Sequence, residues 1–229
     1  MKKLALLIIV GLLSITLFFN GCIREDSNLV NQDAIWTSYT LLYNANEDKT
    51  YAQAIFKFSN ATGAHLQLSD SAKVTFNGEL LSFKPVLAYY EKEYAGLIET
   101  GTFEYTDLDG NVFVNTASPI IATAFPTNVD TISRDAAFEL VWQGNPLSEG
   151  ESMWVSTDGD FEDDARLFIQ DDVNSSSIVL GKDRLEALPE GAADFFMTRL
   201  HTTTAMDGTS HGGIMYSKYR AEDTQFIMK

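Results

Sequence analysis

Residues 51–59, with the sequence YAQAIFKFS, decide the fold class, because apolar and polar side chains alternate along them. An extended chain points successive side chains to opposite faces, so the alanines and phenylalanines of this stretch would share one face of a β-strand. Residues 35–43 have the same period, with Thr37, Tyr39, Leu41 and Tyr43 on one face. Both segments are therefore predicted to be half-buried strands.

Shorter segments of the same kind follow, and we expect strands at residues 66–68, 73–76, 94–98, 102–106 and 112–115. Asn77-Gly78 is a strong signal for a two-residue hairpin turn, since both residues tolerate positive φ. Asp107-Leu108-Asp109-Gly110 is predicted to turn the chain between the last two of these strands. Residues 35–122 are expected to form an all-β domain.

Pro119 and Pro126 bracket a short apolar stretch that suits a linker between two domains. Beyond it we expect strands at residues 129–132, 138–142, 153–156, 166–170, 177–180, 194–203 and 214–219, a density typical of an immunoglobulin-like sandwich. Trp142 is predicted to lie in the core of this second domain, and residues 182–188 to form a helical turn ended by Pro189. The expected fold is all-β, with two immunoglobulin-like β-sandwich domains at residues 35–122 and 123–229.

The amino-terminal segment has the organisation of an export signal. Lys2 and Lys3 precede an apolar run over residues 4–19, and a small residue, Gly21, precedes Cys22. The run is shorter than the roughly 20 residues that a membrane-spanning helix needs. Removal after export is therefore favoured over a permanent transmembrane anchor.

Residues 17–22, LFFNGC, resemble a bacterial lipobox, in which Gly21 and Cys22 match the small residue and the lipidated cysteine. Phe19 and Asn20 depart from its usual form, in a way that is similar to lipoproteins of the Bacteroidota. The resemblance implies a lipoprotein signal peptide at residues 1–21, acyl chains such as palmitate on Cys22, and a polar tether at residues 22–34. Two acyl chains are about enough for a stable membrane anchor. The alternative is a leader cut elsewhere, with Cys22 free.

The lipobox-like end and the strand with Trp142-x-Gly144 together resemble Bacteroidota lipoproteins with tandem immunoglobulin-like β-sandwiches. This resemblance covers residues 35–229 and implies an outer membrane lipoprotein, either periplasmic or surface-exposed. Arg24-Glu25-Asp26 is similar to the acidic tract that sends some of these proteins to the cell surface, and a solvated tether is the alternative. The implied role is a binding or scaffolding module without catalytic activity, with a glycan or another envelope protein as partner.

Charge narrows the possible partners further. The chain has 32 acidic against 16 basic residues and a formal net charge of −16. Proteins that bind nucleic acids need a basic stripe to approach the phosphate backbone. Nucleic acid is therefore excluded as a partner.

One acidic cluster offers a candidate metal site. Its members are Asp158, Asp160, Glu162, Asp163 and Asp164, which lie between two predicted strands. Calcium takes six to eight oxygen ligands, so a loop of this composition could hold the ion. A solvated loop is the alternative, because charge runs usually face water. Calcium is the only cofactor that the sequence suggests.

Tyr89, Tyr90 and Tyr94 form a local aromatic group whose rings could stack on a sugar or a peptide if they are exposed. In the alternative interpretation these rings fill the core. The sequence has no nucleophile elbow, zinc-protease motif or phosphate-binding glycine loop. We therefore expect the protein to have no catalytic activity. The alternative is a glycan-processing hydrolase or accessory protein that uses the carboxylates of residues 158–164.

Overall fold

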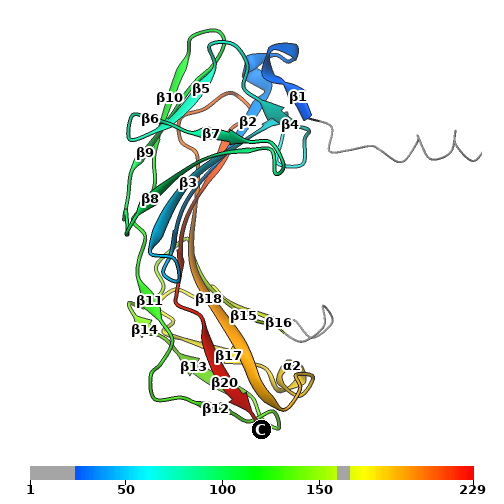
Figure 1. Ribbon diagram of the computed structural model, residues 1–229, viewed down its shortest axis with the longest axis vertical. Coiled ribbons are helices and arrows are strands. Elements are labelled where there is room, and N and C mark those ends of the chain that lie inside the picture. Colours follow the sequence, from blue (N-terminus) through cyan, green and yellow to red (C-terminus); the bar gives the residue numbers. More distant parts are fainter. Residues whose placement is uncertain (1–23, 159–165) are drawn as a thin grey trace, which may run out of the picture.

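The computed structural model describes residues 24–158 and 166–229, and these form an all-β protein. One large sheet runs the whole length of the molecule and is bowed, so that one of its faces is concave (Figure 1). Its hydrogen-bonded order is β1-β4-β3-β2-β19-β18-β15-β16, with four further strands attached beside this path. The strands are β1 (Arg24–Asp26), β2 (Ile35–Asn44), β3 (Lys49–Phe58), β4 (His65–Gln67), β7 (Ser82–Lys84), β8 (Tyr89–Ala95), β12 (Thr131–Ile132), β15 (Glu151–Asp158), β16 (Arg166–Gln170), β18 (Gly191–Thr204), β19 (Gly213–Arg220) and β20 (Thr224–Met228). The all-β prediction is confirmed.

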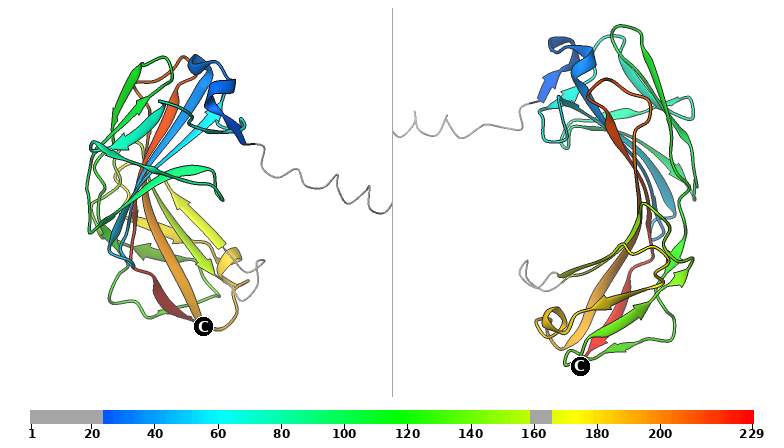
Figure 2. Two further views of the ribbon diagram at one scale, coloured as in Figure 1. Left: turned by 45° about the horizontal axis from the view of Figure 1, so that its top comes forward. Right: turned by 180° about the vertical axis from the view of Figure 1, so that it is seen from behind.

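Smaller sheets cover the convex side of the large sheet (Figures 1 and 2). Over the upper half in Figure 1 lie β5 (Lys73–Phe76), β6 (Glu79–Leu80), β9 (Thr102–Thr106) and β10 (Val112–Thr116). Over the lower half lie two pairs, β11 (Thr123–Ala124) with β14 (Gln143–Gly144) and β13 (Phe138–Val141) with β17 (Ser177–Leu180). A helical turn, α2 (Lys182–Leu185), packs in the lower half, where residues 182–188 were predicted to turn. Each half is thus a two-layer sandwich.

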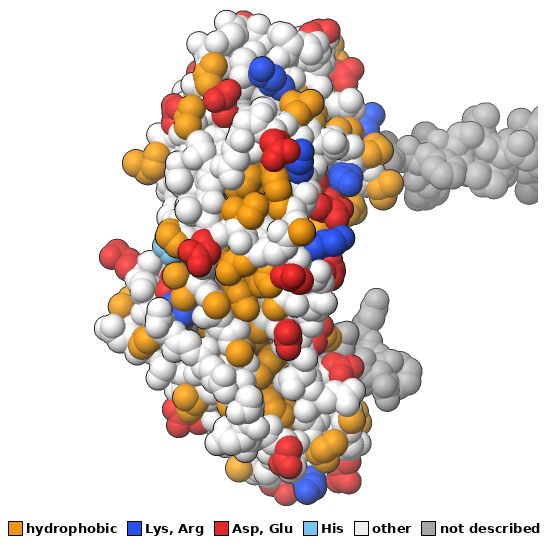
Figure 3. All heavy atoms as spheres, turned by 60° about the vertical axis from the view of Figure 1, so that its left-hand side comes forward, with side chains coloured by type: hydrophobic (Ala, Val, Ile, Leu, Met, Phe, Trp, Pro, Cys, Tyr) orange, Lys and Arg blue, Asp and Glu red, His pale blue; other side chains and the backbone are white. Residues whose placement is uncertain are grey.

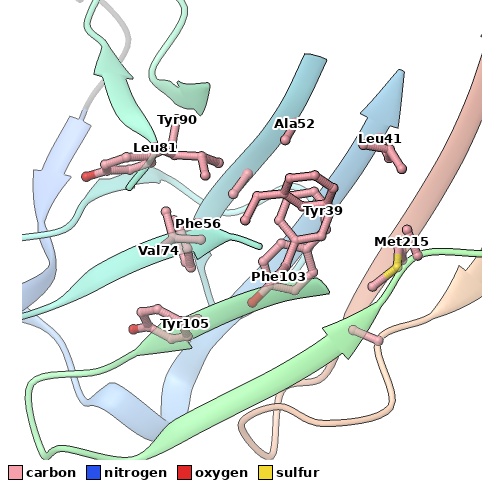
Figure 4. Close-up of a cluster of buried hydrophobic side chains, with 14 of the residues drawn as sticks. Tyr39, Leu41, Ala52, Phe56, Val74, Leu81, Tyr90, Phe103, Tyr105 and Met215 are labelled. Atoms are coloured by element: carbon pink, nitrogen blue, oxygen red, sulfur yellow. The ribbon is translucent and has the colours of Figure 1, made fainter. Parts of the chain in front are cut away.

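The upper core is built mainly from aromatic rings (Figure 4). Tyr39 stacks on Phe103 with ring centroids 5.0 Å apart, and Phe103 contacts Phe76 at 4.8 Å. These side chains come from β2, β9 and β5, so they join the large sheet to its cover. Buried rings of this size contribute a large share of the hydrophobic stabilisation.

The lower core combines apolar packing with a buried ion pair. Trp142 is 3% exposed, which confirms the predicted core tryptophan. In the ion pair, the Arg199 Nε donates to Glu151 Oε1 at 3.0 Å, and the guanidinium also donates to the backbone oxygens of Asn145 and Pro146. Burial opposes ionisation of Glu151, but the hydrogen bonds from Arg199 and the Ser148 amide prevail, so the pKa of this carboxyl is lowered.

The two halves share strands, which the predicted division at residue 122 does not anticipate. β18 crosses from the lower half into the upper half, and β19 then pairs in parallel with β2, from Gly213 opposite Thr37 to Arg220 opposite Asn44. Met215 of β19 consequently packs in the upper core (Figure 4). A Cβ atom at position 213 would lie 2.6 Å from the Thr37 carbonyl oxygen, so glycine is needed where the two strands meet.

Local turn predictions agree with the structure. Asn77 and Gly78 have φ of 50° and 82° and connect β5 to β6. The Asp107–Gly110 segment connects β9 to β10, with Thr106 opposite Val112. In both places the turn residues accept the backbone geometry that a tight hairpin requires.

Residues 24–34, predicted to belong to a polar tether, are instead part of the folded body. β1 pairs in parallel with β4, and two 3-10 turns follow, η1 (Ser27–Leu29) and η2 (Gln32–Ala34). Ser27 is completely buried, and the Gln32 side chain donates to its carbonyl oxygen at 2.7 Å. The tether prediction was wrong here because these polar side chains satisfy backbone groups inside the fold rather than facing water.

Candidate functional site

The candidate site is the concave face of the large sheet, which no other described element covers along most of its length (Figure 1). Residues directly opposite in neighbouring strands point to the same side of a sheet, so the strand register defines the membership of this face. We call it the open face; its central members are Trp36, Ser38, Thr40 and Leu42 of β2, Tyr51, Gln53 and Ile55 of β3, Tyr89, Glu91 and Glu93 of β8, Tyr216, Lys218 and Arg220 of β19, Phe196, Thr198 and Leu200 of β18, Ser152 and Trp154 of β15, and Leu167 and Ile169 of β16.

In the upper half of the open face, polar groups pair with one another. Glu91 is 8% exposed and accepts hydrogen bonds from Gln53 Nε2 at 2.8 Å and from the Tyr89 hydroxyl at 3.0 Å. Lys84 lies 3.5 Å from its other carboxylate oxygen. Tyr89 also borders a shallow hollow with Ser38, Gln53 and Leu87. This carboxylate is thus neutralised by its own surroundings.

In the lower half of the open face, larger side chains surround a small one. Thr198 lies in the middle of three strands, directly opposite Trp154 on one side and Arg220 on the other. Opposed residues on adjacent strands have Cα atoms about 5 Å apart. The Cα atoms of Trp154 and Arg220 are therefore about 10 Å apart, with Thr198 between them. Phe196 and Leu200 flank it along β18. The Thr198 hydroxyl thus lies between an indole and a guanidinium on the neighbouring strands.

Trp154 and Arg220 are held in place by neighbours. The Trp154 Nε1 donates to Ser152 Oγ at 2.9 Å, and the side chain is still 39% exposed. The Arg220 guanidinium lies 5.1 Å from the centre of the Phe196 ring and forms an ion pair with Asp223 at 3.1 Å. An indole with a satisfied N–H and an exposed ring is a ready surface for stacking.

Lys218 is a half-buried cation on the open face. Its cross-strand neighbours are Leu200 and Leu42, and its ammonium lies 5.0 Å from the centre of the Tyr216 ring. Burial among these side chains lowers its pKa. The ion pairs found among residues 24–158 and 166–229 do not include Lys218. An anion bound here would offset the cost of holding this cation out of water.

The opposite side of the molecule also has a hollow, at the junction of the two halves. Apolar side chains run down the middle of that side (Figure 3). Tyr43 and Tyr219 lie there with ring centroids 5.3 Å apart, next to Asp223. The Tyr43 hydroxyl donates to Asp48, and Asp223 accepts from Arg220 and Asn46. Because these polar groups are used within the fold, we place the candidate site on the open face.

The three tyrosines predicted to form one aromatic patch do not share a face. Tyr90 is 7% exposed and belongs to the upper core, where the Leu68 amide donates to its hydroxyl at 2.7 Å and burial raises its pKa to about 12. Tyr94 packs against Phe76 on the same side of β8. Tyr89 alone lies on the open face, since β8 points alternate side chains to opposite sides.

Most of the other predicted site residues lie outside the described part of the chain. This applies to Cys22 and to Asp160, Glu162, Asp163 and Asp164, while Asp158 is described only as the last residue of β15. Within residues 24–158 and 166–229, no three His, Cys, Asp or Glu side chains are grouped to hold a metal ion. In the same ranges no helix has the length and hydropathy that crossing a bilayer requires. Lipidation and calcium binding stay predictions.

Sequence reasoning missed the residues of the lower open face. For Trp154 the sequence does contain a signal, because the apolar residues Met153 and Val155 stand on either side of it. Both of these neighbours are buried in the structure. Alternation therefore places the tryptophan on the other face. Lys218 gave no comparable signal, because its significance depends on strands that lie far apart in sequence.

The chain is similar to known proteins among the solved structures. No family model matches the chain, and no curated protein matches it either. Among solved structures, the chain is similar to one described as "Structural insight into host cell surface retention of a 1.5-MDa bacterial ice-binding adhesin", with 12% identity and a TM-score of 0.25 over 84% of this chain and 65% of that chain. It is also similar to the chicken CNTN1 FN1-FN3 domains, with 12% identity and a TM-score of 0.33 over 83% of this chain and 66% of that chain. The chain thus spans slightly less than two thirds of each, and at these scores we take no function from either.

Proposed function

We propose that the protein is a non-catalytic binding module of the bacterial envelope, held on the outer membrane by lipid at Cys22, and that it binds a glycan on the open face. The observation that supports binding is the wide concave sheet with exposed Trp154, Leu167 and Ile169 (39%, 41% and 53% exposed). An apolar surface of this kind on a folded body is typical of an interaction site.

A glycan suits this face better than a peptide. The backbone groups of the central strands are used in pairing within the sheet, so a peptide could not add to them through its main chain. Recognition must therefore come from side chains such as Trp154, whose flat ring can pack on the apolar face of a sugar. The hydroxyl of Thr198 and the guanidinium of Arg220, on the strands beside it, supply hydrogen-bonding groups.

Lys218 favours a sugar that carries a carboxylate. A half-buried ammonium without an ion-pair partner among the described residues gains most from an anionic ligand. The carboxylates of the upper open face already have partners, so they do not compete for it. An acidic polysaccharide is the ligand class that the lower open face fits.

The binding proposal is tested with polygalacturonate and with the same polymer after full methyl esterification, which removes the charge but keeps the sugar. We expect the protein to bind the acidic form and to lose affinity about tenfold in Trp154→Ala or Lys218→Met. Val112→Ala, at an exposed site on β10 on the convex side of the molecule, is the control. Equal affinity for both polymers, or unchanged affinity in both open-face variants, would rule out this site.

The anchoring proposal is tested separately, by the intact mass of the native protein. We expect a chain that begins at Cys22 and carries diacylglycerol on the thiol. A chain that retains residues 1–21, or one with a free thiol at Cys22, would disprove the lipid anchor and leave the binding test unaffected.

A further inference from the structure

The turn between β7 and β8 exposes apolar side chains next to the place where the chain enters the body. Val86 is 93% exposed and Leu87 is 67% exposed, the largest such values in one described turn. This turn and β1 lie at the same rim of the concave side (Figures 1 and 2). Water-exposed valine and leucine at a loop tip cost solvation free energy unless another surface covers them.

Contacts tie this turn firmly to β1. Arg24 pairs with His65 in the sheet, and the His65 Nδ1 lies 3.1 Å from the Ala88 carbonyl oxygen. The Arg24 guanidinium also lies 5.3 Å from the centre of the Phe83 ring, at the start of the same hairpin. The turn is thus held at a fixed position beside the first strand.

The chain length to the lipidation site limits how far a membrane can be from this turn. Arg24 is two residues after Cys22, and a polypeptide spans at most about 3.6 Å per residue. The Cα atom of a lipidated Cys22 would therefore lie within roughly 7 Å of the Arg24 Cα atom, which keeps the bilayer close to β1. Because residues 24–34 are folded, no flexible tether separates the body from the anchor.

The charge around the turn also suits a lipid surface. The notch beside it is lined by Arg24, His65 and residues 85–88, and this described lining contains no carboxylate. A guanidinium beside exposed apolar side chains matches the phosphate and acyl layers of a bilayer surface.

We infer that the β7–β8 turn is a second membrane contact, in which Val86 and Leu87 enter the lipid interface while Arg24 meets the headgroups. This inference rests on the proposed lipid anchor. Two contacts fix the orientation of the body on the membrane, whereas a single acyl anchor would leave it free to swivel.

The test uses the full lipidated protein with Val86→Cys, in vesicles of phosphatidylethanolamine and phosphatidylglycerol. Since lipid occupies the Cys22 thiol, the new cysteine is the only one that an environment-sensitive fluorophore can label. We expect a blue-shifted emission and several-fold weaker quenching by aqueous iodide than for the same label at Val179→Cys, which lies in the lower half. Adding Leu87→Asp should return the label at position 86 to water.

The outcomes separate this inference from the proposed function. If the intact mass shows lipid on Cys22 but both labels are quenched equally, the turn does not touch the membrane and the inference is overturned, while the anchor stands. Equal protection of both labels would also overturn it, because that would indicate aggregation or contact between copies. If the sample carries no lipid, the proposed anchor and the inference both fail.

Discussion

The two halves of the open face lie on one sheet but differ in whether their buried charged side chains have partners. In the upper half, Glu91 is surrounded by donors from Gln53, Tyr89 and Lys84. In the lower half, Lys218 lies between leucines with an aromatic ring as its described neighbour. A polar group that is satisfied by its neighbours stabilises the fold, whereas one that is not satisfied is retained at a cost in stability. This difference is the reason why we propose the lower half as the ligand-binding part of the open face.

The largest expected effect concerns the cores beneath the two halves. Phe103→Ala in the upper core and Phe195→Ala in the lower core should each lower the free energy of unfolding by about 3–5 kcal/mol. Because β18 and β19 run through both halves, each variant should shift one common transition in urea. Two separate transitions, of which only one moves in each variant, would show that the halves fold independently.

The buried ion pair distinguishes the lower core from the upper one. Arg199→Met leaves Glu151 buried without its partner, so we expect a loss of about 3–5 kcal/mol, measured by urea unfolding. The double variant Arg199→Met with Glu151→Leu should recover part of that loss. A cost below about 1 kcal/mol for the single variant would show that the pair is solvated.

The same pair predicts an acid dependence. The pKa of Glu151 is lowered in the folded state, so its contribution to stability is present above the ordinary carboxyl pKa and is lost as the pH falls through the folded value. Glu151→Gln should therefore flatten this part of the curve of stability against pH. An unchanged slope in the variant would contradict the assignment.

Substitutions on the open face should change the free energy of unfolding by less, and with opposite signs in its two halves. Glu91→Leu removes the acceptor shared by Gln53, Tyr89 and Lys84, and should cost about 1 kcal/mol, since these partners are partly exposed. Thermal unfolding of the variant and of Glu93→Leu, whose partner Lys49 is exposed, gives the comparison. A stabilised Glu91→Leu variant would remove the contrast between the two halves.

The smallest expected effect is a gain in stability. Lys218→Met should raise the free energy of unfolding by less than about 1 kcal/mol, because it removes a charge that burial disfavours. Since the folded pKa of Lys218 lies below its ordinary value, wild-type stability should rise with pH between the two values, and the variant should lack this rise. Lys49→Met, which breaks an exposed ion pair, should show no gain. A destabilised Lys218→Met variant would indicate a structural role for the ammonium.

Local sequence patterns predicted most of the strands and the tight turns, but not how distant strands meet. The strand expected at residues 94–98 was wrong, because β8 covers Tyr89–Ala95 and Gly96, with φ of 73°, turns the chain there. Asn77-Gly78 and the alternation in residues 51–59 depend on neighbouring residues alone, so both predictions agree with the structure. The parallel pairing of β19 with β2 joins segments about 175 residues apart, and no local period encodes it. The lower open face could not be predicted as a site, since Trp154, Thr198 and Lys218 come together only through this sheet.

The most direct test of the open face as the binding surface follows the indole N–H signals of the three tryptophans by NMR during titration with oligogalacturonate. Trp154 lies on the lower open face, Trp36 on the upper open face and Trp142 in the lower core. We predict that the Trp154 signal shifts saturably while the Trp142 signal stays in place, and that Lys218→Met needs about tenfold more ligand to reach the same shift. An unmoved Trp154 signal at saturating ligand would contradict the assignment of this face as the binding site.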